Sequence, residues 1–349
     1  MNEKEIMQRC IELAAMGLGR VLSNPLVGCV ILKDGKVIGE GFHKEYGKEH
    51  AEINAINSVK NKNDLFGSTM FVTLEPCSHY GKTPPCIESI IKSKIKEVII
   101  ASKDPNPIVN GKGISKLLEN NIEVKVGILE DEYRFVNRRY FTFIEKKRPY
   151  IILKWAQSVD GFITEPSGKK WFTSNNSKML VHKWRAEEMA ILVGSKTVEN
   201  DNPYLTVRLI KGNNPIRIII TNHILQTDLN VFDSSSKTIV VTQNINVFNY
   251  YSNLSSFINS NKEVVYFDKS TLLLKELLSL LYERKIISII VEGGLYTLER
   301  FLELDLYDEC RIFITNKEFK NGIKAPAVRV KNLNYFKVGN DTLLTMYNF

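Results

Sequence analysis

The feature that most constrains this chain is a set of potential zinc ligands: His50-Ala51-Glu52 is followed by Pro76-Cys77 and then by Cys86. Zinc prefers imidazole nitrogen and thiolate sulfur, and a catalytic zinc has three protein ligands and a fourth position left to water. His50, Cys77 and Cys86 have the right types and number, so the fold is expected to bring them together. Buried structural residues are the weaker interpretation, because the His-Ala-Glu occurs here with a Pro-Cys and a second Cys.

Glu52 adds the chemistry of proton transfer to this set. Bound zinc lowers the pKa of its water to about 7, and a nearby carboxylate can take that proton and deliver it to a leaving amine. Glu52 lies two residues after His50, in the first turn of a helix expected over residues 49–59. Both side chains can then reach one small volume without both being ligands. The sequence therefore predicts the hydrolytic deamination of a base, with Glu52 as the proton shuttle.

The segment between the two cysteines has an unusual length. Eight residues, 78–85, separate Cys77 from Cys86, whereas the commonest nucleobase-deaminase signature has two. The segment is polar and ends in Pro84-Pro85, which indicates a loop stiffened just before a helix over residues 87–93. A Cys86 thiolate at a helix start is favoured by the helix dipole. The loop is either a longer surface loop or one that contacts substrate.

Helix and strand patterns alternate along the first half of the chain. Asp34-Gly35 between two apolar runs predicts a hairpin, and the order of the patterns predicts a three-layer α/β domain with its metal ligands at helix starts. The expected helices are residues 3–18, 49–59, 87–93 and 114–120, and the expected strands are residues 28–32, 36–41, 69–73, 97–101 and 123–126.

A second α/β domain is expected after a basic linker. Polar and charged residues are dense over 130–139, and residues 145–148, before Pro149, are the linker candidate. We therefore predict domains 1–148 and 149–349. The second domain is expected to contain strands at residues 150–153, 189–193, 217–221, 238–242, 263–267 and 287–292, and helices at residues 271–284 and 297–302.

Composition limits the class of protein. The chain of 349 residues is 44% hydrophobic and 25% charged, a profile typical of soluble globular proteins. It contains no run of 18 apolar residues, and its first residues lack the pattern of a signal peptide, so we expect a cytoplasmic protein with no membrane partner. Cys10, Cys29 and Cys310 are expected to be buried thiols.

The net charge of +8 raises the question of nucleic-acid binding. The lysines are dispersed rather than gathered into a stripe with interleaved aromatic residues, so we expect a solvated basic surface and no nucleic-acid partner. The same charge would attract phosphorylated small molecules.

The segment LEPCSHYGKTPPC at residues 74–86 is a long and specific motif. It is very similar to the signature of one family, the bifunctional deaminase/reductases of riboflavin biosynthesis. Matches continue through both halves of the chain, at residues 24–28, 104–107, 111–113, 154–161 and 291–294.

This resemblance implies the fold and the reactions. It implies a cytidine-deaminase-like domain followed by a dihydrofolate-reductase-like domain, and one zinc per chain. The first domain would deaminate 2,5-diamino-6-(5-phosphoribosylamino)pyrimidin-4(3H)-one. The second would reduce the ribosyl group of the product to ribityl, using NADPH. The expected partner is this phosphorylated pyrimidine, and a homo-oligomer, dimer or tetramer, is expected.

The glycine pair Gly293-Gly294 illustrates what the resemblance adds. It lies between an apolar run at residues 286–291 and the helix expected at 297–302, where backbone amides can approach a phosphate. By itself a plain tight turn is an equally good interpretation. The resemblance implies that this turn holds NADPH, although no Gly-x-Gly-x-x-Gly motif is present.

Further site residues are implied by matching positions in the family. Lys154 and Glu292 would act at the sugar. The substrate pocket of the deaminase would contain Asn24, His43, Lys82, Asp104 and Asn106. In the reductase, Arg185, Leu205, Arg208 and Glu292 would hold the substrate, and Ala156, Trp171, Thr197, Asp201, Gly293 and Gly294 would line the cofactor.

Two other functions are compatible with part of these observations. One is a zinc deaminase of another nucleotide or of a tRNA base, with a second domain that only binds. A basic aromatic stripe would favour it, and the sequence has none. The other is a binding or regulatory protein derived from an enzyme that has lost activity, against which the intact set of zinc ligands and Glu52 argues.

Overall fold

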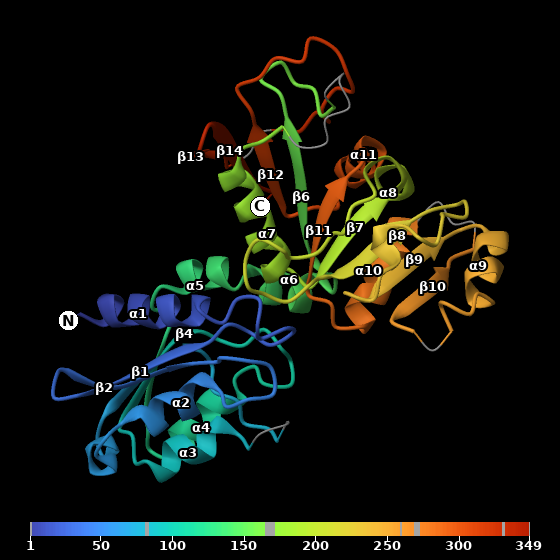
Figure 1. Ribbon diagram of the computed structural model, residues 1–349. Helices are drawn as coiled ribbons and strands as arrows, with labels where there is room; N and C mark the ends of the chain where they lie inside the picture. The colour runs from blue at the N-terminus through green and yellow to red at the C-terminus, as the bar shows by residue number, and fades with distance from the viewer. Residues whose placement is uncertain are drawn as a thin grey trace. The chain divides into compact units, whose positions relative to one another are not determined.

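The computed structural model describes residues 2–80, 84–164, 172–258, 260–268, 273–329 and 332–348 (Figure 1). The chain divides into two compact units, Met1–Lys147 and Arg148–Phe349, one residue before the expected boundary. Each unit has its own sheet and its own hydrophobic core.

The first unit is built on a five-stranded sheet of order β2-β1-β3-β4-β5. The first three strands in this order are antiparallel, and the last three are parallel. Asp34 and Gly35 have φ of 49° and 72°, as a two-residue type I′ hairpin turn requires, so the Asp-Gly hairpin is confirmed. The strands are β1 (Gly28–Lys33), β2 (Lys36–Phe42), β3 (Thr69–Leu74), β4 (Glu97–Ser102) and β5 (Glu123–Val126).

Helices cover both faces of this sheet, which confirms the three-layer architecture. In Figure 1, α1 and α5 lie on one face, and α2, α3 and α4 on the other. Buried apolar residues of the helices and strands form one core between the layers. The helices are α1 (Glu3–Ala15), α2 (Ala51–Ser58), α3 (Cys86–Lys92), α4 (Lys112–Glu119), α5 (Glu130–Val136) and α6 (Arg138–Lys146), with a 3-10 turn at Lys62–Leu65.

The region before the domain boundary differs from the expectation. The sequence indicates a polar, charged stretch at 130–139 and a linker at 145–148, but residues 130–136 and 138–146 form α5 and α6. Their apolar side chains are spaced so that Tyr133, Tyr140, Phe141 and Phe143 are buried, and burial of large aromatic groups outweighs the charged composition. The expected linker at 145–148 is therefore shorter, because α6 continues through Lys146.

The second unit is built on a nine-stranded sheet of order β10-β9-β8-β7-β11-β6-β12-β14-β13. Strands β10 to β12 in this order are parallel, and β14 and β13 are added antiparallel. The strands are β6 (Tyr150–Gln157), β7 (Ala190–Gly194), β8 (Ile216–Ile220), β9 (Thr238–Thr242), β10 (Lys262–Tyr266), β11 (Ser288–Gly293), β12 (Glu309–Ile314), β13 (Asn334–Val338) and β14 (Asp341–Tyr347).

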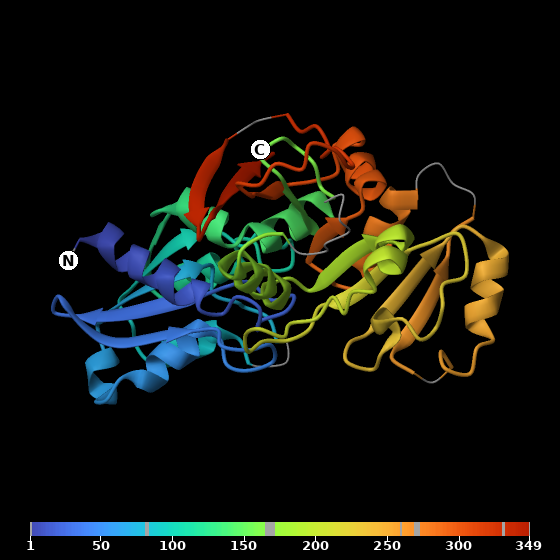
Figure 2. The same cartoon turned by 45° about the horizontal axis from the view of Figure 1, so that its top comes forward.

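Helices bury both faces of the parallel part, which explains why its central strands are continuously apolar. One core cluster lies under α10 and α11, and the other under α7, α8 and α9. Figure 2 shows α9, in gold, alongside the strands of that half of the sheet. The helices are α7 (Asn175–Glu187), α8 (Ser195–Asp201), α9 (Ile245–Ser252), α10 (Leu273–Glu283) and α11 (Leu295–Glu303), with a 3-10 turn at Asn230–Phe232.

The connections of this sheet change direction between β7 and β11. The chain leaves β7 through α8 toward β8, on one side, and leaves β11 through α11 toward β12, on the other. In open α/β sheets, ligands bind outside the carboxyl ends of the strands at such a switch point. The ends of β7 and β11 are Gly194 and Gly293.

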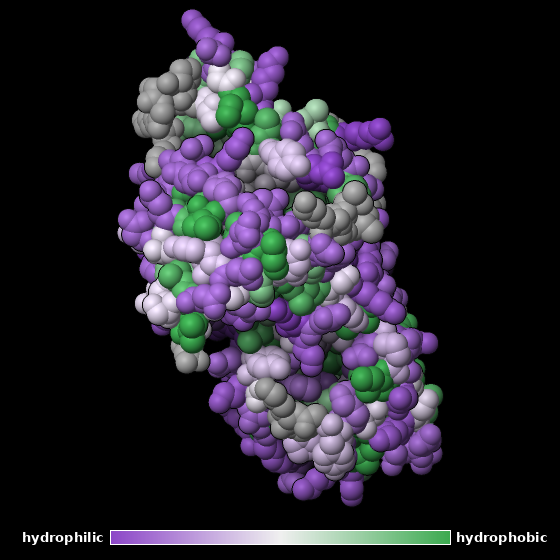
Figure 3. Space-filling view, turned by 90° about the vertical axis from the view of Figure 1, so that its right-hand side faces the viewer, coloured by the Kyte–Doolittle hydropathy of each residue, from purple (hydrophilic) through white to green (hydrophobic). Residues whose placement is uncertain are grey.

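Two compositional expectations can be compared with the fold. Cys10, Cys29 and Cys310 are buried and free, as predicted. The longest helices among the described residues, α1 and α7, have 13 residues each, too short for a membrane span. The face in Figure 3 is mainly hydrophilic, with apolar residues scattered over it.

Candidate active sites

His50, Cys77 and Cys86 come together in the first unit. Nδ1 of His50 lies 3.5 Å from Sγ of Cys77 and 3.3 Å from Sγ of Cys86, and the three ligand atoms all lie within 4.8 Å of one another. A tetrahedral zinc, with bonds of about 2.3 Å to sulfur and about 2.0 Å to nitrogen, separates its ligand atoms by about 3.6 Å. The donor types and their spacing therefore fit a zinc ion.

Two of these ligands lie at helix starts, as expected. His50 is the residue before the first turn of α2, and Cys86 is the first residue of α3. Cys77 instead follows β3 in a loop, so that part of the expectation was wrong. The backbone N–H of Cys86 donates to Sγ of Cys77 over 3.3 Å. Hydrogen bonds with the Cys86 and His50 side chains outweigh burial and lower the pKa of Cys77 to about 4, which favours the thiolate.

Glu52 lies beside the three ligands in the first turn of α2. Its side chain lies close enough to Cys86 to interact with it electrostatically, and the residue is only 3% exposed. Burial raises the pKa of its carboxyl group to about 7, since a buried carboxylate loses hydration. A buried carboxyl group therefore lies next to the ligand cluster.

Asn24 and His43 form a second layer at this site. Nδ1 of His43 lies 3.1 Å from the carbonyl oxygen of Glu49, and Nε2 lies 3.0 Å from Nδ2 of Asn24. Because a carbonyl only accepts, Nδ1 carries the proton and Nε2 accepts from the Asn24 amide. Burial lowers the pKa of His43, which favours this neutral form. The His43 ring also meets that of His50 edge to face, 5.3 Å between centroids.

Asp104 and Asn106 lie in the loop after β4. Oδ1 of Asp104 accepts the backbone N–H of Asn106 and the hydroxyl of Tyr140, each over 2.9 Å. The first bond is the local turn that Asp-Pro-Asn-Pro forms in ordinary loops. Burial raises the pKa of Asp104 to about 6. Lys82, matched to the same pocket, lies outside the described residues.

Glu75 has a structural role that was not predicted from the sequence. Its buried carboxylate accepts the backbone N–H groups of Gly111, Gly113 and Ile114 over 2.9 to 3.2 Å, at the start of α4. A Cβ on Gly113 would lie 2.2 Å from the carbonyl oxygen of Pro76. Glu75 thus connects the end of β3, which leads to Cys77, with α4. The two motifs that meet here, Glu-Pro-Cys at residues 75–77 and Gly-Lys-Gly at residues 111–113, are the signal that could have indicated this contact.

We expect Glu75→Gln to destabilise the first unit. A neutral amide replaces a charged acceptor of several N–H groups, and hydrogen bonds to charged groups contribute about 1.5–3 kcal/mol. The free energy of unfolding of this unit, measured by denaturant titration, should fall by roughly that amount, and ammonia release should fall with it. Glu119→Gln, an exposed change on the same helix, is the matched control. Equal stability of the two variants would show that this contact does not stabilise the unit.

Lys154, Glu292 and Arg185 form a buried ionic cluster in the second unit. Arg185 donates from Nε and Nη2 to the two oxygens of Glu292 over 2.9 and 2.7 Å, and Nζ of Lys154 lies 3.6 Å from the same carboxylate. The three side chains are between 5% and 11% exposed. Burial would raise the pKa of Glu292, but Arg185 and Lys154 outweigh it and lower the pKa to about 2. Glu292 is therefore charged.

The two arginines matched to the substrate site differ in surroundings. Arg185 is bound to Glu292 and also donates to the carbonyl of Thr206 over 3.4 Å. Arg208 is exposed; it donates to Oγ1 of Thr206 over 2.9 Å and lies over the ring of Tyr204, 5.1 Å from its centroid. Leu205, in the same loop as Arg208, is buried in the core and has φ of 54°. Arg208 is thus the arginine open to a ligand.

The glycines at the ends of β7 and β11 leave a narrow cradle. A Cβ on Gly294 would lie 3.1 Å from Oγ1 of Thr197, and one on Gly194 would lie 2.7 Å from Oγ1 of Thr297. Gly293 has φ of 124°, which other residues rarely adopt. Gly294 is the residue before α11 and has no side chain of its own to cap the backbone N–H groups there. This cradle fits the pyrophosphate of a dinucleotide.

Three other residues are matched to the cofactor site of the family. Ala156 is half-buried on β6, two residues beyond Lys154 and on the same face of the sheet. Asp201 is exposed at the last position of α8. Trp171 lies outside the described residues.

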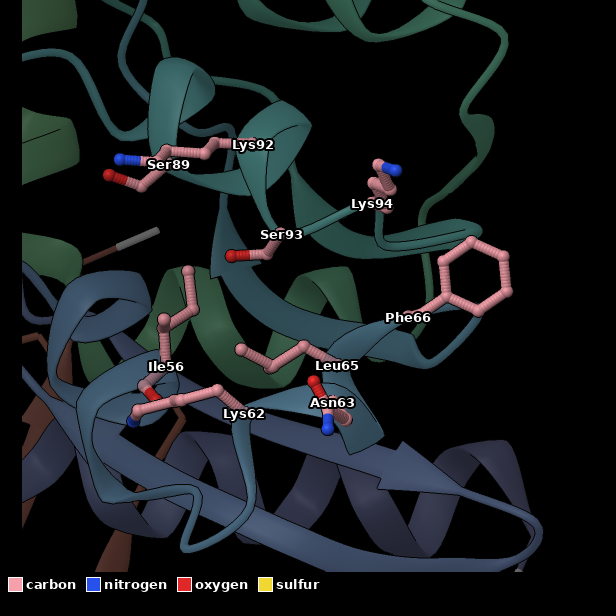
Figure 4. Close-up of a pocket in the computed structure, with 9 residues that line it drawn as sticks. All are labelled: Ile56, Lys62, Asn63, Leu65, Phe66, Ser89, Lys92, Ser93 and Lys94. Carbon is pink, nitrogen blue, oxygen red and sulfur yellow. The ribbon is translucent and has the colours of Figure 1, made fainter.

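A cavity of about 690 Å³ elsewhere in the first unit is separate from these sites. Its walls come from the ends of α2 and α3 opposite the zinc ligands, with Ile56 and Lys92, and from the 3-10 turn at Lys62–Leu65 that Phe66 follows (Figure 4). Lys62 in its wall donates to the carbonyls of Ile56 and Asn57, the role of a cation at a helix C-terminus.

Comparisons with known proteins cover both units. Residues 1–102 match the family model described as the cytidine and deoxycytidylate deaminase zinc-binding region. Residues 149–318 match the model described as the RibD C-terminal domain. The first match contains all three candidate zinc ligands and the second contains Lys154 and Glu292.

Whole-length relatives give the same assignment. The chain is 38% identical over 335 residues to the riboflavin biosynthesis protein RibD of Aquifex aeolicus, covering 95% of this chain and 92% of the relative. A crystal structure of a diaminohydroxyphosphoribosylaminopyrimidine deaminase/5-amino-6-(5-phosphoribosylamino)uracil reductase from Thermotoga maritima is 36% identical, with a TM-score of 0.86 over 99% of this chain and 98% of that one. RibD of Acinetobacter baumannii is 32% identical, with a TM-score of 0.87 and the same coverage.

These relatives extend over both units, so a deaminase with a merely binding second domain is not favoured. The resemblance drawn from the motifs is confirmed. The chain belongs to the RibD family, the bifunctional deaminase/reductases of riboflavin biosynthesis.

Proposed function

We propose that each unit carries out one of two consecutive reactions. The first unit removes ammonia from 2,5-diamino-6-(5-phosphoribosylamino)pyrimidin-4(3H)-one, and the second reduces the ribosyl group of the product to ribityl with NADPH. The observation that carries the proposal is that the zinc-type cluster of His50, Cys77 and Cys86 and the ionic cluster of Lys154 and Glu292 belong to different units.

In the first unit, His50, Cys77 and Cys86 would hold zinc. When bound, zinc lowers the pKa of a water molecule to about 7. Glu52 is positioned beside the ligands to accept the proton of that water and to donate it to the departing amine. Asn24, held by the neutral His43, and the loop with Asp104 and Asn106 would orient the pyrimidine.

In the second unit, Gly293, Gly294 and Thr197 would hold NADPH, which supplies the hydride. Ala156, Asp201 and Trp171 would complete its binding site, as the resemblance implies.

Lys154 is held against Glu292, and burial lowers the pKa of its ammonium group. A buried ammonium can donate a proton to the sugar oxygen as the carbon is reduced, and Glu292 keeps it oriented. Arg208 would bind the substrate phosphate, because a guanidinium matches phosphate geometry. Leu205 and Arg185 would shape and support this binding site, and Lys82 would do the same in the deaminase pocket.

The direct test measures both reactions with the purified protein. We expect ammonia release from the diaminopyrimidine without NADPH, and NADPH oxidation once the deaminated product has formed. Ammonia release from other nucleotides, together with no NADPH oxidation on the aminouracil, would contradict the proposal and favour the alternative zinc deaminase.

Binding of NADPH to the glycine cradle has a thermal consequence. A ligand that binds only the folded state stabilises it, by about 2.7 kcal/mol at one hundred times its Kd. NADPH should therefore raise the unfolding temperature of the second unit, and Gly294→Val should abolish the shift, because the added side chain would meet Thr197. Glu303→Gln, at the far end of α11, should keep the shift. A full shift in Gly294→Val would place NADPH elsewhere.

Two properties stay predictions. The homo-oligomer, a dimer or a tetramer, can be tested by sedimentation equilibrium. The cytoplasmic location can be tested by fractionation.

A further inference from the structure

His182 is a buried residue on α7 that the proposed reactions do not use. It is 2% exposed and precedes Arg185 by one helical turn. Its Nδ1 accepts the backbone N–H of Arg208 over 3.0 Å. Arg185 donates to the carbonyl of Thr206. Successive turns of α7 therefore hold the backbone of the loop at residues 204–208 at two points.

The hydrogen bond from the backbone of Arg208 defines the protonation state of the His182 ring. Because Nδ1 accepts a hydrogen bond, it carries no proton, and the neutral ring has its proton on Nε2. Burial, followed by the charges of Arg185 and Arg208, lowers the pKa of His182 to about 4. The ring is therefore neutral at physiological pH, and the acceptor is present.

The loop that His182 holds presents one exposed cation. The guanidinium of Arg208 is oriented by Oγ1 of Thr206 and by the ring of Tyr204. Both of these residues belong to the same short loop, so the direction of the guanidinium depends on where the backbone of Arg208 lies. His182 contacts that backbone directly, and a displaced backbone would move the guanidinium with it.

We infer that His182 is a positioning residue that makes the reductase select phosphorylated substrate, by fixing the backbone of Arg208. The inference rests on the proposed function, in which Arg208 binds the substrate phosphate. A histidine with only a core-packing role would affect stability, but not the choice between phosphorylated and unphosphorylated substrates. That difference provides the test.

The experiment compares two substrates in the reductase assay: 5-amino-6-(5-phosphoribosylamino)uracil and the same compound without phosphate. His182→Phe keeps a ring and removes the acceptor, whereas His182→Asn keeps an acceptor near the place of Nδ1. We expect His182→Phe to raise KM for the phosphorylated substrate about tenfold with little change in kcat, and to leave KM for the other substrate unchanged. His182→Asn should recover most of the preference.

A double-mutant cycle with Arg208→Ala shows whether His182 acts through the arginine. Arg208→Ala should abolish the preference for phosphate, and adding His182→Phe should cause no further loss. If Arg208→Ala keeps the preference, the proposed role of Arg208 is wrong. If Arg208→Ala loses it and folded His182→Phe retains it, or if the two losses add, the inference about His182 is wrong.

Folding is controlled by the unfolding midpoint of every variant and by the thermal shift with NADPH. Should His182→Phe not fold, His182→Gln provides the same test, because it moves the acceptor one bond further along the side chain. It should then raise KM for the phosphorylated substrate more than His182→Asn does. The inference would be overturned if, in the wild type and in both amide variants, the phosphorylated and unphosphorylated substrates had the same KM.

Discussion

Replacing Glu52 with glutamine is expected to slow ammonia release roughly 10²- to 10⁴-fold, the typical cost of losing proton transfer by a positioned side chain. The amide has nearly the same shape, so the zinc ligands should stay in place. Reduction of the already deaminated aminouracil should remain close to the wild-type rate, because Lys154 and Glu292 lie in the other unit. Ammonia and NADPH assays on the same preparation measure both rates.

The reciprocal variant is Lys154→Met, which keeps the apolar stem and removes the ammonium group. It should lose reduction and retain ammonia release. Glu49→Gln, an exposed change just before α2, is the control for Glu52→Gln and should leave both activities intact. Loss of both activities in either folded site variant would be incompatible with two independent sites.

Cys77→Ser is expected to remove the metal together with the deaminase activity. A serine hydroxyl is a poor substitute for a thiolate ligand, and only His50 and Cys86 would remain from the set of three. Zinc content, measured by elemental mass spectrometry, should fall from about one per chain to near zero. The unfolding midpoint of the first unit should fall as well, because metal binding contributes to folding.

Cys10→Ala is the matched control for this variant. Its thiol is buried and donates to the carbonyl of Phe71, and burial raises its pKa, so it is not a ligand. This variant should keep its zinc and its ammonia release. A fully active Cys77→Ser protein without metal would eliminate the zinc mechanism.

Most strands of both units were predictable because their signals are local, and the zinc cluster was predictable from the ligand types that zinc prefers. The Asp34-Gly35 hairpin depends on two residues, and the strand at 238–242 is a short apolar run. The His50 and Cys86 contact could be anticipated because the chemistry of zinc requires it, although the residues are far apart in sequence. In such cases either local conformation or known coordination chemistry is sufficient to predict the structure from the sequence.

Other parts of the fold and of the sites depend on tertiary packing and were not predicted from the sequence. Helices α7 and α8 have mixed composition, and the buried side chains of His182 and Arg185 on α7 contact the distant loop at 204–208. Strands β13 and β14 were not anticipated, since the pattern at residues 334–347 is irregular and its pairing with β12 is non-local. Glu75 has no distinctive pattern of its own, because its partners are backbone groups of residues 111–114.

The strand order of the second unit has a consequence for how the protein is synthesised. β6 is the first strand of that unit to leave the ribosome, but both of its neighbours, β11 and β12, begin only at Ser288 and Glu309. Such long-range pairing is slow and exposes apolar strands to aggregation. The strands of the first unit pair within its own 147 residues. This unit can therefore complete its fold before the partner strands of β6 have been synthesised. During translation, the apolar strand β6 therefore stays without its partner strands until almost the whole chain has been made.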